Sequence, residues 1–293
     1  MVIDDLCIAD LLDDSPEPNR ETMPEPAGPR EPLALFRLRC HPFQDSVNPN
    51  FFFRTDAHEN AFIAMKRCVE EDISLGLTTA VSGTGKTLLT QVLLQDLAAN
   101  PKYRPILSLI YPKMSRASLL QDICSELDID ATKRAFTRDV VNLIQQKIME
   151  LHTQGIKLVL LIDEVHFLDA DNLHVLRTLS NIEIPEKKLL TVLLFGEDCF
   201  LKKLENPIYK SILNRMFTRV QLRELTRDEV EQYVKYRLLL AGGSPKLFDS
   251  SCFDALAQMS GGVPREINRI CYNAMRQAAE LGRKSIGTDL LEG

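Results

Sequence analysis

Apolar and polar positions along the chain follow two periods, and their order predicts a parallel sheet. Short apolar runs that fit β-strands lie at residues 75–81, 105–111, 158–162, 189–195 and 217–222. Apolar positions recur at helical spacing over residues 56–73, 87–99, 115–127, 137–152 and 171–182. The run at 158–162 is continuously apolar, as in a central strand that is covered on both faces. Strands that alternate with helices in this way indicate βαβ units and an α/β fold.

Polar residues mark where several of these helices begin. We expect Asp56 and Thr137 to cap two of them, and Ser115 to start a third. Gly155 comes soon after the helix that Thr137 begins, and glycine is common at helix ends.

After residue 222 the strand pattern ends and only helical patterns follow. Thr226 and Glu229 form a capping box for a helix that reaches about residue 240. A second helix is expected over residues 251–259, and a third from Pro264 to about residue 281. We therefore predict a parallel-sheet domain over residues 32–223 and a small all-α domain over residues 224–293.

The first 31 residues differ in composition from the rest of the chain. They are rich in aspartate, glutamate and proline, and such a segment cannot bury enough apolar surface to offset its chain entropy. This predicts a disordered acidic tail. Scattered apolar residues at 2–12 leave an alternative, a docking peptide that folds on a partner.

Composition and charge narrow the class of protein. The 293 residues are 45% hydrophobic and 26% charged, which suits a soluble chain with one core and a smaller second unit. The net charge of -6 argues against a broad basic surface for nucleic acid. DNA stays possible through a local patch, but the candidate basic side chains lie in different segments and form no stripe: Lys66, Arg67, Lys113, Arg116, Lys133 and Arg134.

Cysteine spacing and apolar run length bear on the compartment. The seven cysteines form no C-x-x-C pair, which predicts free thiols in a reducing compartment and no zinc site. No apolar run reaches the roughly 18 residues of a membrane-spanning helix, and the N-terminus lacks the basic start of a signal peptide. We therefore expect a cytoplasmic protein.

A glycine-rich loop follows the first predicted strand and precedes a helix. In such a loop the backbone N–H groups bind phosphates, the lysine reaches the β and γ phosphates, and the hydroxyl after it ligates Mg²⁺. The first glycine of the usual pattern is replaced by Ala80, which is acceptable if that residue keeps a negative φ. The residues that we expect to hold ATP are Ser82, Gly83, Thr84, Gly85, Lys86, Thr87 and Leu88, with Thr87 also on the metal.

Two carboxylates follow the continuously apolar strand. Ligands of parallel sheets bind at the carboxyl ends of strands, so Asp163 is expected beside the loop as a second Mg²⁺ ligand. Glu164 is then placed to polarise the attacking water as a catalytic residue. The alternative for this pair is a strand that simply exits into a polar turn. His166 is either a sensor of the nucleotide state or, the interpretation that we favour, a surface or helix-capping residue.

The loop and the acidic pair together resemble those of AAA+ ATPases. Residues 261–268 read G-G-V-P-R-E-I-N and residues 233–242 read Y-V-K-Y-R-L-L-L-A-G, and both resemble signatures of the ExeA/GspA secretion ATPases and the related MshM pilus ATPases. The resemblance covers roughly residues 35–285. TniB-type transposition ATPases share the core more loosely. The N-terminal part of the chain also resembles the opening of the ExeA/GspA group, through Pro42-Phe43, Asn48-Pro49, the phenylalanines at 51–53 and His58-Glu59.

The resemblance implies a P-loop NTPase (AAA+) fold with a small helical lid, and further site residues. Arg265 is similar to the lid arginine that reaches the γ-phosphate of its own subunit. Arg215 is similar to an arginine finger that acts on a neighbouring subunit, and Arg219 is the second candidate. A solvated surface charge is the alternative for each arginine. Glu197 departs from the group, which usually has glutamine there, and a carboxylate repels the γ-phosphate unless it is turned away or paired.

Three functions stay open. The first is an ExeA/GspA-like ATPase that uses ATP and Mg²⁺ to drive homo-oligomer assembly or to remodel an unidentified protein partner. The second is a DNA-associated ATPase of a transposition or mobile-element system. The third is a slowly hydrolysing scaffold that docks partners through its acidic tail. Secretion members continue into a membrane span and a peptidoglycan-binding domain, and this chain ends at Gly293 with neither, so we do not expect the secretion role itself.

Overall fold

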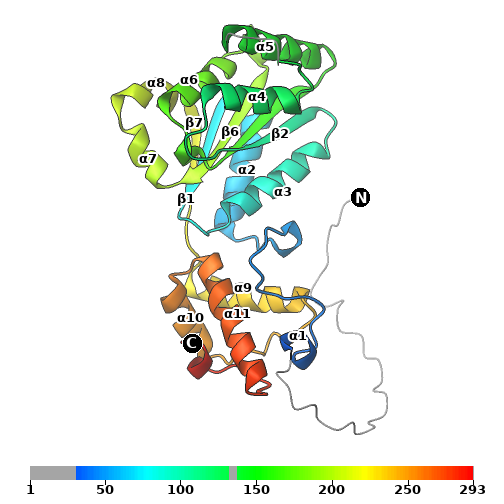
Figure 1. Cartoon of the computed structure of the whole chain (residues 1–293), viewed down its shortest axis with the longest axis vertical. Helices are drawn as coiled ribbons and strands as arrows, with labels where there is room; N and C mark the ends of the chain where they lie inside the picture. The colour runs from blue at the N-terminus through cyan, green and yellow to red at the C-terminus, as the bar shows by residue number, and fades with distance from the viewer. Residues whose placement is uncertain (1–30, 132–136, 293) are drawn as a thin grey trace.

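The computed structural model describes residues 31–131 and 137–292 (Figure 1). The predictions for the acidic tail, for Lys133 and Arg134 and for Cys7 therefore lie outside the described residues, apart from Glu31 at the end of the tail. No helix in the described part of the chain has the length and apolar character needed to cross a bilayer.

A five-stranded parallel sheet forms the centre of the larger half of the molecule. Its spatial order is β2-β3-β6-β1-β7. This confirms the predicted α/β fold with a parallel sheet. The strands are β1 (Leu75–Ala80), β2 (Tyr103–Leu109), β3 (Lys157–Asp163), β6 (Leu190–Glu197) and β7 (Met216–Leu222). A hairpin of two short strands, β4 (Glu183–Ile184) and β5 (Lys187–Lys188), precedes β6.

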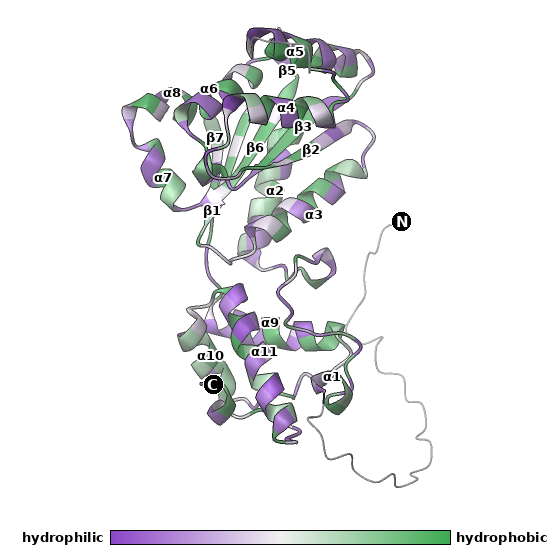
Figure 2. Cartoon of the chain, viewed as in Figure 1, coloured by the Kyte–Doolittle hydropathy of each residue, from purple (hydrophilic) through white to green (hydrophobic). Residues whose placement is uncertain are grey.

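Helices cover both faces of this sheet, which explains the continuously apolar run of β3. Alternate residues of β3 enter two separate hydrophobic clusters: Leu160 packs with α4, α5 and α6, and Leu161 packs with α2 and α3. Figure 2 shows the central strands as the hydrophobic interior of this half. The helices are α2 (Asp56–Glu70), α3 (Lys86–Ala98), α4 (Arg116–Glu126), α5 (Thr137–Thr153), α6 (Ala170–Leu179), α7 (Cys199–Leu204) and α8 (Lys210–Leu213), with short 3₁₀ turns η2 (Pro49–Phe51), η3 (Val165–Phe167) and η4 (Pro207–Tyr209).

Two predicted helix caps are wrong by one or more residues. Thr55, not Asp56, caps α2: its hydroxyl accepts a hydrogen bond from the His58 N–H at 3.3 Å, and Asp56 lies inside the first turn. A carboxylate in the first turn still interacts favourably with the helix dipole, so the sequence pattern suits either position. Thr137 is already helical. Ser115 caps α4 as expected.

Three helices with a core of their own follow β7. They are α9 (Arg227–Leu240), α10 (Cys252–Ser260) and α11 (Pro264–Glu280), and the 3₁₀ turn η5 (Thr288–Leu290) lies near the end of the chain. The predicted capping box of Thr226 and Glu229 at the start of α9 is confirmed. Hydrogen bonds from Arg223 hold the pKa of Glu229 at about 2.

The first described residues pack on these C-terminal helices. The short helix α1 (Pro32–Leu35) lies beside α11 (Figure 1). Phe43 is 1% exposed and meets Phe248 edge to face, with ring centroids 6.0 Å apart. Arg39 N–H donates a hydrogen bond to the carbonyl of Ala241 at 2.8 Å. The chain thus crosses from the helical unit to the sheet through residues 44–55, beside the loop that follows β1.

Candidate functional site

The glycine-rich loop lies where the carboxyl ends of the central strands meet. It connects the end of β1 at Ala80 to the start of α3 at Lys86. In the same edge of the sheet, β3 ends at Asp163 and β6 ends at Glu197. The carboxyl edge of a parallel sheet is the usual ligand-binding edge of such folds. The sequence-predicted loop residues and the acidic pair are therefore brought together.

The loop is closed by its own polar groups. The Lys86 ammonium donates hydrogen bonds to the carbonyls of Ala80 and Val81, at 3.1 and 3.0 Å. The Thr84 hydroxyl donates to the same Val81 carbonyl at 2.7 Å. Gly85 has φ 106°, a backbone conformation that other residues rarely adopt. Ala80 lies in extended strand and needs no glycine, so its departure from the usual pattern has no steric cost.

Four carboxylates surround the single ammonium group of the loop. Lys86 is 7% exposed, and burial lowers its pKa because the charged form loses water. The attraction of neighbouring carboxylates opposes this effect, in decreasing order Glu197, Glu164, Asp163 and Asp198. With four carboxylates around one ammonium group, a phosphate binds more favourably when a cation binds together with it.

Asp163 carries an unsatisfied buried oxygen. The side chain is 1% exposed; its Oδ1 accepts the Glu164 N–H at 2.9 Å, and Oδ2 has no hydrogen-bond partner among the described residues. Burial raises its pKa, and interactions with the Glu164 N–H, the Thr87 side chain and Lys86 lower it in part. A carboxylate oxygen without a partner, close to a threonine hydroxyl, is a donor set of the kind that Mg²⁺ takes. The residues present therefore fit a magnesium ion.

Glu164 is held in a strained backbone conformation beside Asp163. Its φ of 59° lies in the left-handed region, which costs energy for a residue other than glycine and recurs at functional sites. Its carboxylate is one third exposed and lies 3.4 Å from His166 Nδ1. Burial and the charge of Asp163 raise its pKa. His166 lies in η3 and is partly buried, with 11% of its side chain exposed, so it is not a fully exposed surface histidine.

Glu197 is aligned with the start of the loop. It pairs in strand register with Ala80, and the N–H of the following Asp198 donates to the Ala80 carbonyl at 3.2 Å. The Lys86 ammonium donates to this same carbonyl. The charge of the Glu197 carboxylate acts on Lys86, where it opposes the effect of burial on the pKa of that lysine.

Arg265 lies against the loop from the helical unit. Its N–H donates to the Gly83 carbonyl at 3.2 Å, and a Cβ added to Gly83 would lie 2.9 Å from the Cβ of Arg265. The residue is exposed and occupies the first turn of α11, whose N-terminal end therefore faces the loop. The structure thus brings Arg265 to the same edge as Lys86 and Asp163.

Arg215 lies at the opposite end of the sheet. It precedes β7, where Met216 pairs with Leu75 at the start of β1, whereas the loop follows Ala80. Five residues of strand separate these points, which is about 17 Å. The guanidinium donates a hydrogen bond to Asn181 Oδ1. Arg219, also on β7, is exposed and donates to the Leu213 carbonyl at 2.9 Å. Arg215 therefore cannot reach the loop of its own chain.

Sequence reasoning missed an aromatic pocket and a histidine beside the loop. The pocket has a volume of about 40 Å³. Its walls come from both halves of the molecule: Gly85 and Leu88 belong to the sheet half, and Tyr233 and Pro264 to the helical half. The phenylalanines at 51–53 line it as well. His58 lines it as well and is 4% exposed. The phenylalanine run was noticed in the sequence, but no local pattern links it to a loop thirty residues later.

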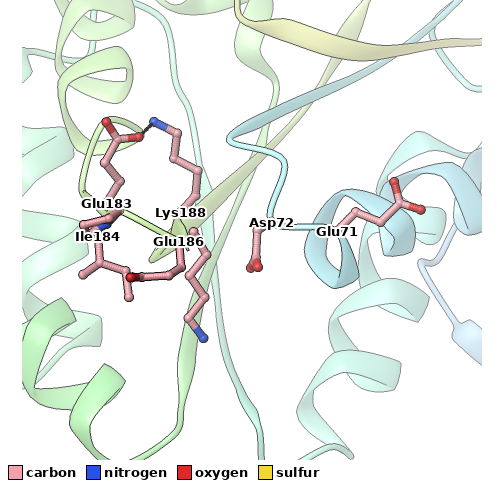
Figure 3. Close-up of a pocket in the computed structure, with 8 residues that line it drawn as sticks. Glu71, Asp72, Glu183, Ile184, Glu186 and Lys188 are labelled. Atoms are coloured by element: carbon pink, nitrogen blue, oxygen red, sulfur yellow. Dashed lines mark hydrogen bonds and ion pairs between the residues drawn. The ribbon is translucent and has the colours of Figure 1, made fainter.

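A larger hollow of about 500 Å³ lies at the other end of the sheet (Figure 3). It is framed by the end of α2 and the β4–β5 hairpin, and its lining mixes both signs of charge. Asp72 on its wall forms an ion pair with Lys157 at 2.7 Å. It lies where β1 and β6 begin, so it is separate from the loop.

Comparisons with known proteins agree with this geometry. The model of a family described as AAA domain matches residues 70–204. General secretion pathway protein A of Aeromonas hydrophila is 32% identical over 228 residues, which is 78% of this chain and 41% of that protein. The chain therefore spans about two fifths of the length of this relative.

Solved structures share the fold at low identity. The ORC2 protein of Aeropyrum pernix, in ADPNP-ADP complexes, has a TM-score of 0.65 and 15% identity over 86% of this chain and 70% of its own. CDC6P of Pyrobaculum aerophilum has a TM-score of 0.66 and 16% identity over 84% of this chain and 67% of its own. Domain III of Thermotoga maritima DnaA has a TM-score of 0.55 and 13% identity over 85% of this chain and 95% of its own. The chain thus contains a region that matches the AAA domain, has the P-loop AAA+ fold, and resembles General secretion pathway protein A.

Proposed function

We propose that this chain binds ATP with Mg²⁺ and hydrolyses it to ADP and phosphate. The observation that supports this most is the buried Asp163 Oδ2, which has no hydrogen-bond partner in the part of the chain that the structure describes and lies with Thr87 and Lys86 beside Glu164. A bound Mg²⁺ would neutralise part of the phosphate charge and would be held by Thr87 and Asp163. The relatives solved with ADPNP and ADP support nucleotide as the ligand class.

The residues of the chain have separate parts in the proposed reaction. The N–H groups of residues 82–88 bind the phosphates, with Lys86 on the β and γ groups. Glu164 accepts a proton from the attacking water. The oxygen of that water bonds to the γ-phosphorus while the bond between the γ-phosphorus and the β–γ bridging oxygen breaks. Arg265 contributes positive charge to the γ-phosphate from the lid.

Nucleotide entry is proposed to move the two halves of the molecule relative to each other. The aromatic pocket is adjacent to the loop, and its apolar walls suit a planar base. Its volume of about 40 Å³ is far below the roughly 300–1,000 Å³ of small-molecule pockets, so a base enters only if Tyr233 and Pro264 move away from Leu88. This movement is our basis for coupling the nucleotide state to assembly or to remodelling of a protein partner.

We infer that hydrolysis needs a second copy of the chain. Arg215 is too far from its own loop to contact a γ-phosphate there, and it lies beside the exposed Phe217, which is 82% accessible. A head-to-tail contact brings the Arg215 end of one subunit to the loop of the next.

A second use of the same site is a scaffold that hydrolyses ATP slowly. Glu197 favours it, because a carboxylate at the end of β6 opposes the charge of the γ-phosphate. DNA binding has less support. The ORC1 protein of Aeropyrum pernix was solved in complex with DNA, but at 15% identity this likeness concerns the fold alone. In this chain Lys66, one of the candidate basic residues, forms an ion pair with Asp96 at 2.9 Å.

Lys86→Ala is expected to weaken Mg-ATP binding by at least about 100-fold, because a buried ammonium on the phosphates is lost. Isothermal titration calorimetry measures this. Lys157→Ala is a matched control: Lys157 is partly buried and also has a lowered pKa, but it pairs with Asp72 at the far end of the sheet. We expect the control to lower the melting temperature and to keep ATP affinity. Unchanged affinity in Lys86→Ala would exclude the loop as the nucleotide site.

Glu197→Gln is expected to increase the rate of ATP hydrolysis about tenfold. Removing the Glu197 charge removes a repulsion: two like unit charges 4 Å apart repel by about 4 kcal/mol at an effective dielectric constant near 20. Solvent screens part of this repulsion, so the expected gain in rate is smaller. Steady-state phosphate release measures the rate, and Glu186→Gln, in the hairpin of Figure 3, is the control for an exposed charge. A rate equal to or below that of the unmodified chain would mean that Glu197 does not limit hydrolysis.

A further inference from the structure

His58 connects three parts of the molecule near the loop. It lies in the first turn of α2, and its ring is wedged between the Thr55 cap and the backbone of the loop. Phe52 meets the ring edge to face, with centroids 5.7 Å apart at 84°. Both side chains also line the aromatic pocket. A ligand that fills this pocket therefore lies against the same ring that contacts the loop.

The hydrogen bonds of His58 define its tautomer. Nε2 lies 3.1 Å from the Thr84 carbonyl oxygen, which can only accept, so Nε2 carries the proton. Nδ1 lies 2.8 Å from the Thr55 hydroxyl, which donates to it. Burial lowers the pKa of His58, the Thr84 carbonyl and Glu229 raise it, and Arg223 lowers it. The ring is thus a neutral donor that is fixed at both nitrogens.

The bond to Thr84 sets the direction of the next N–H group. In a trans peptide the C=O and the N–H point in opposite directions. Because the Thr84 carbonyl points to His58, the N–H of Gly85 points away from the ring, and it has no acceptor among the described residues. A Cβ added to Gly85 would lie 3.2 Å from His58 Nε2, so the ring occupies the space into which a side chain at position 85 would project.

We propose that His58 is a positioning residue that aims the Gly85 N–H at the β-phosphate of a bound nucleoside di- or triphosphate. This deepens the proposed function and rests on it. Rotation of the Thr84–Gly85 peptide would turn a carbonyl toward the phosphates, and a lone pair in place of a donor repels an anion. The donor at Nε2 prevents that rotation before the ligand arrives, so less ordering is needed on binding.

Two amide variants separate the two ring nitrogens. The side-chain N–H of Gln reaches the position of Nε2, whereas Asn reaches only that of Nδ1 and loses the bond to Thr84. We expect His58→Asn to bind Mg-ADP about tenfold more weakly than the unmodified chain, and His58→Gln to bind it within about threefold. Calorimetry with ADP measures affinity, and melting without nucleotide measures folding. His174→Asn, on α6, is the control for histidine loss elsewhere.

The outcomes separate this inference from the proposed function. An unmodified chain that binds neither ADP nor ATP contradicts the proposed function itself. If that chain binds ADP and His58→Asn binds it equally well, only the role of His58 is overturned. A role in folding alone predicts that affinity follows the melting temperature in both variants. A Gln variant that melts like the Asn variant but binds ADP more tightly supports positioning, and equal losses in the two overturn it.

Discussion

Glu164→Gln is expected to bind Mg-ATP with near-normal affinity and to hydrolyse it about 100- to 10,000-fold more slowly, the range typical of a lost general base. Glutamine has the shape of glutamate but cannot accept the proton of the attacking water. It also leaves Asp163, Thr87 and Lys86, the groups proposed to hold the nucleotide, unchanged. Phosphate release at saturating ATP measures hydrolysis, and calorimetry measures binding.

The pKa of Glu164 gives this prediction a second readout. Burial and Asp163 raise that pKa, so the carboxylate takes up its proton at a higher pH than an exposed glutamate. A base that is protonated cannot act, so turnover of the unmodified chain should fall as pH decreases through this pKa. The fall should be absent from the residual rate of Glu164→Gln. The matched control is Glu205→Gln, at an exposed position after α7. If Glu164→Gln kept normal turnover, another group would have to be the base.

Local pattern was enough to predict the sheet, the C-terminal helices and the position of the glycine-rich loop beside the acidic pair. Each of these features depends on residues that are adjacent in the sequence. Examples are a glycine run between a strand and a helix, and a carboxylate pair at the end of an apolar strand. The strand ends then come together without further information, because parallel strands in one sheet have their carboxyl ends at one edge. The sequence also marks Glu197 as a departure, and the structure aligns it with Ala80, where the loop begins.

The parts that sequence reasoning missed depend on contacts between distant segments. His58 and Thr84 are 26 residues apart, and the phenylalanines at 51–53 meet Tyr233 only when the chain has folded back. Periodicity reports which face of a helix is apolar and not which surface will cover it. Phe43 illustrates this, because its partner Phe248 belongs to the C-terminal helices. The choice of Thr55 over Asp56 as a cap also follows from this packing, since Thr55 bonds to His58 as well.

Arg215→Ala is expected to bind ATP normally and to lose about 1,000-fold or more in hydrolysis, the effect usual for an arginine finger. The residue lies about 17 Å from its own loop, measured as five residues of strand. The loss therefore requires that the guanidinium acts on another subunit. Arg219→Ala is the control near the same strand end, since Arg219 lies on β7, is exposed and donates a hydrogen bond to the Leu213 carbonyl. A full loss in Arg219→Ala, with Arg215→Ala active, would exchange the two roles.

Mixing tests whether the arginine works between subunits. Lys86→Ala chains cannot hold ATP but still present Arg215, and Arg215→Ala chains hold ATP but lack the arginine. In a randomly mixed head-to-tail assembly, about a quarter of the contacts combine an intact loop with an intact Arg215, so activity should return to roughly that fraction of normal. Phosphate release from the equimolar mixture measures the return, and native mass spectrometry shows whether the chains co-assemble. Mixed assemblies without activity would rule out a role in trans, and the distance to its own loop would then leave Arg215 no part in the reaction.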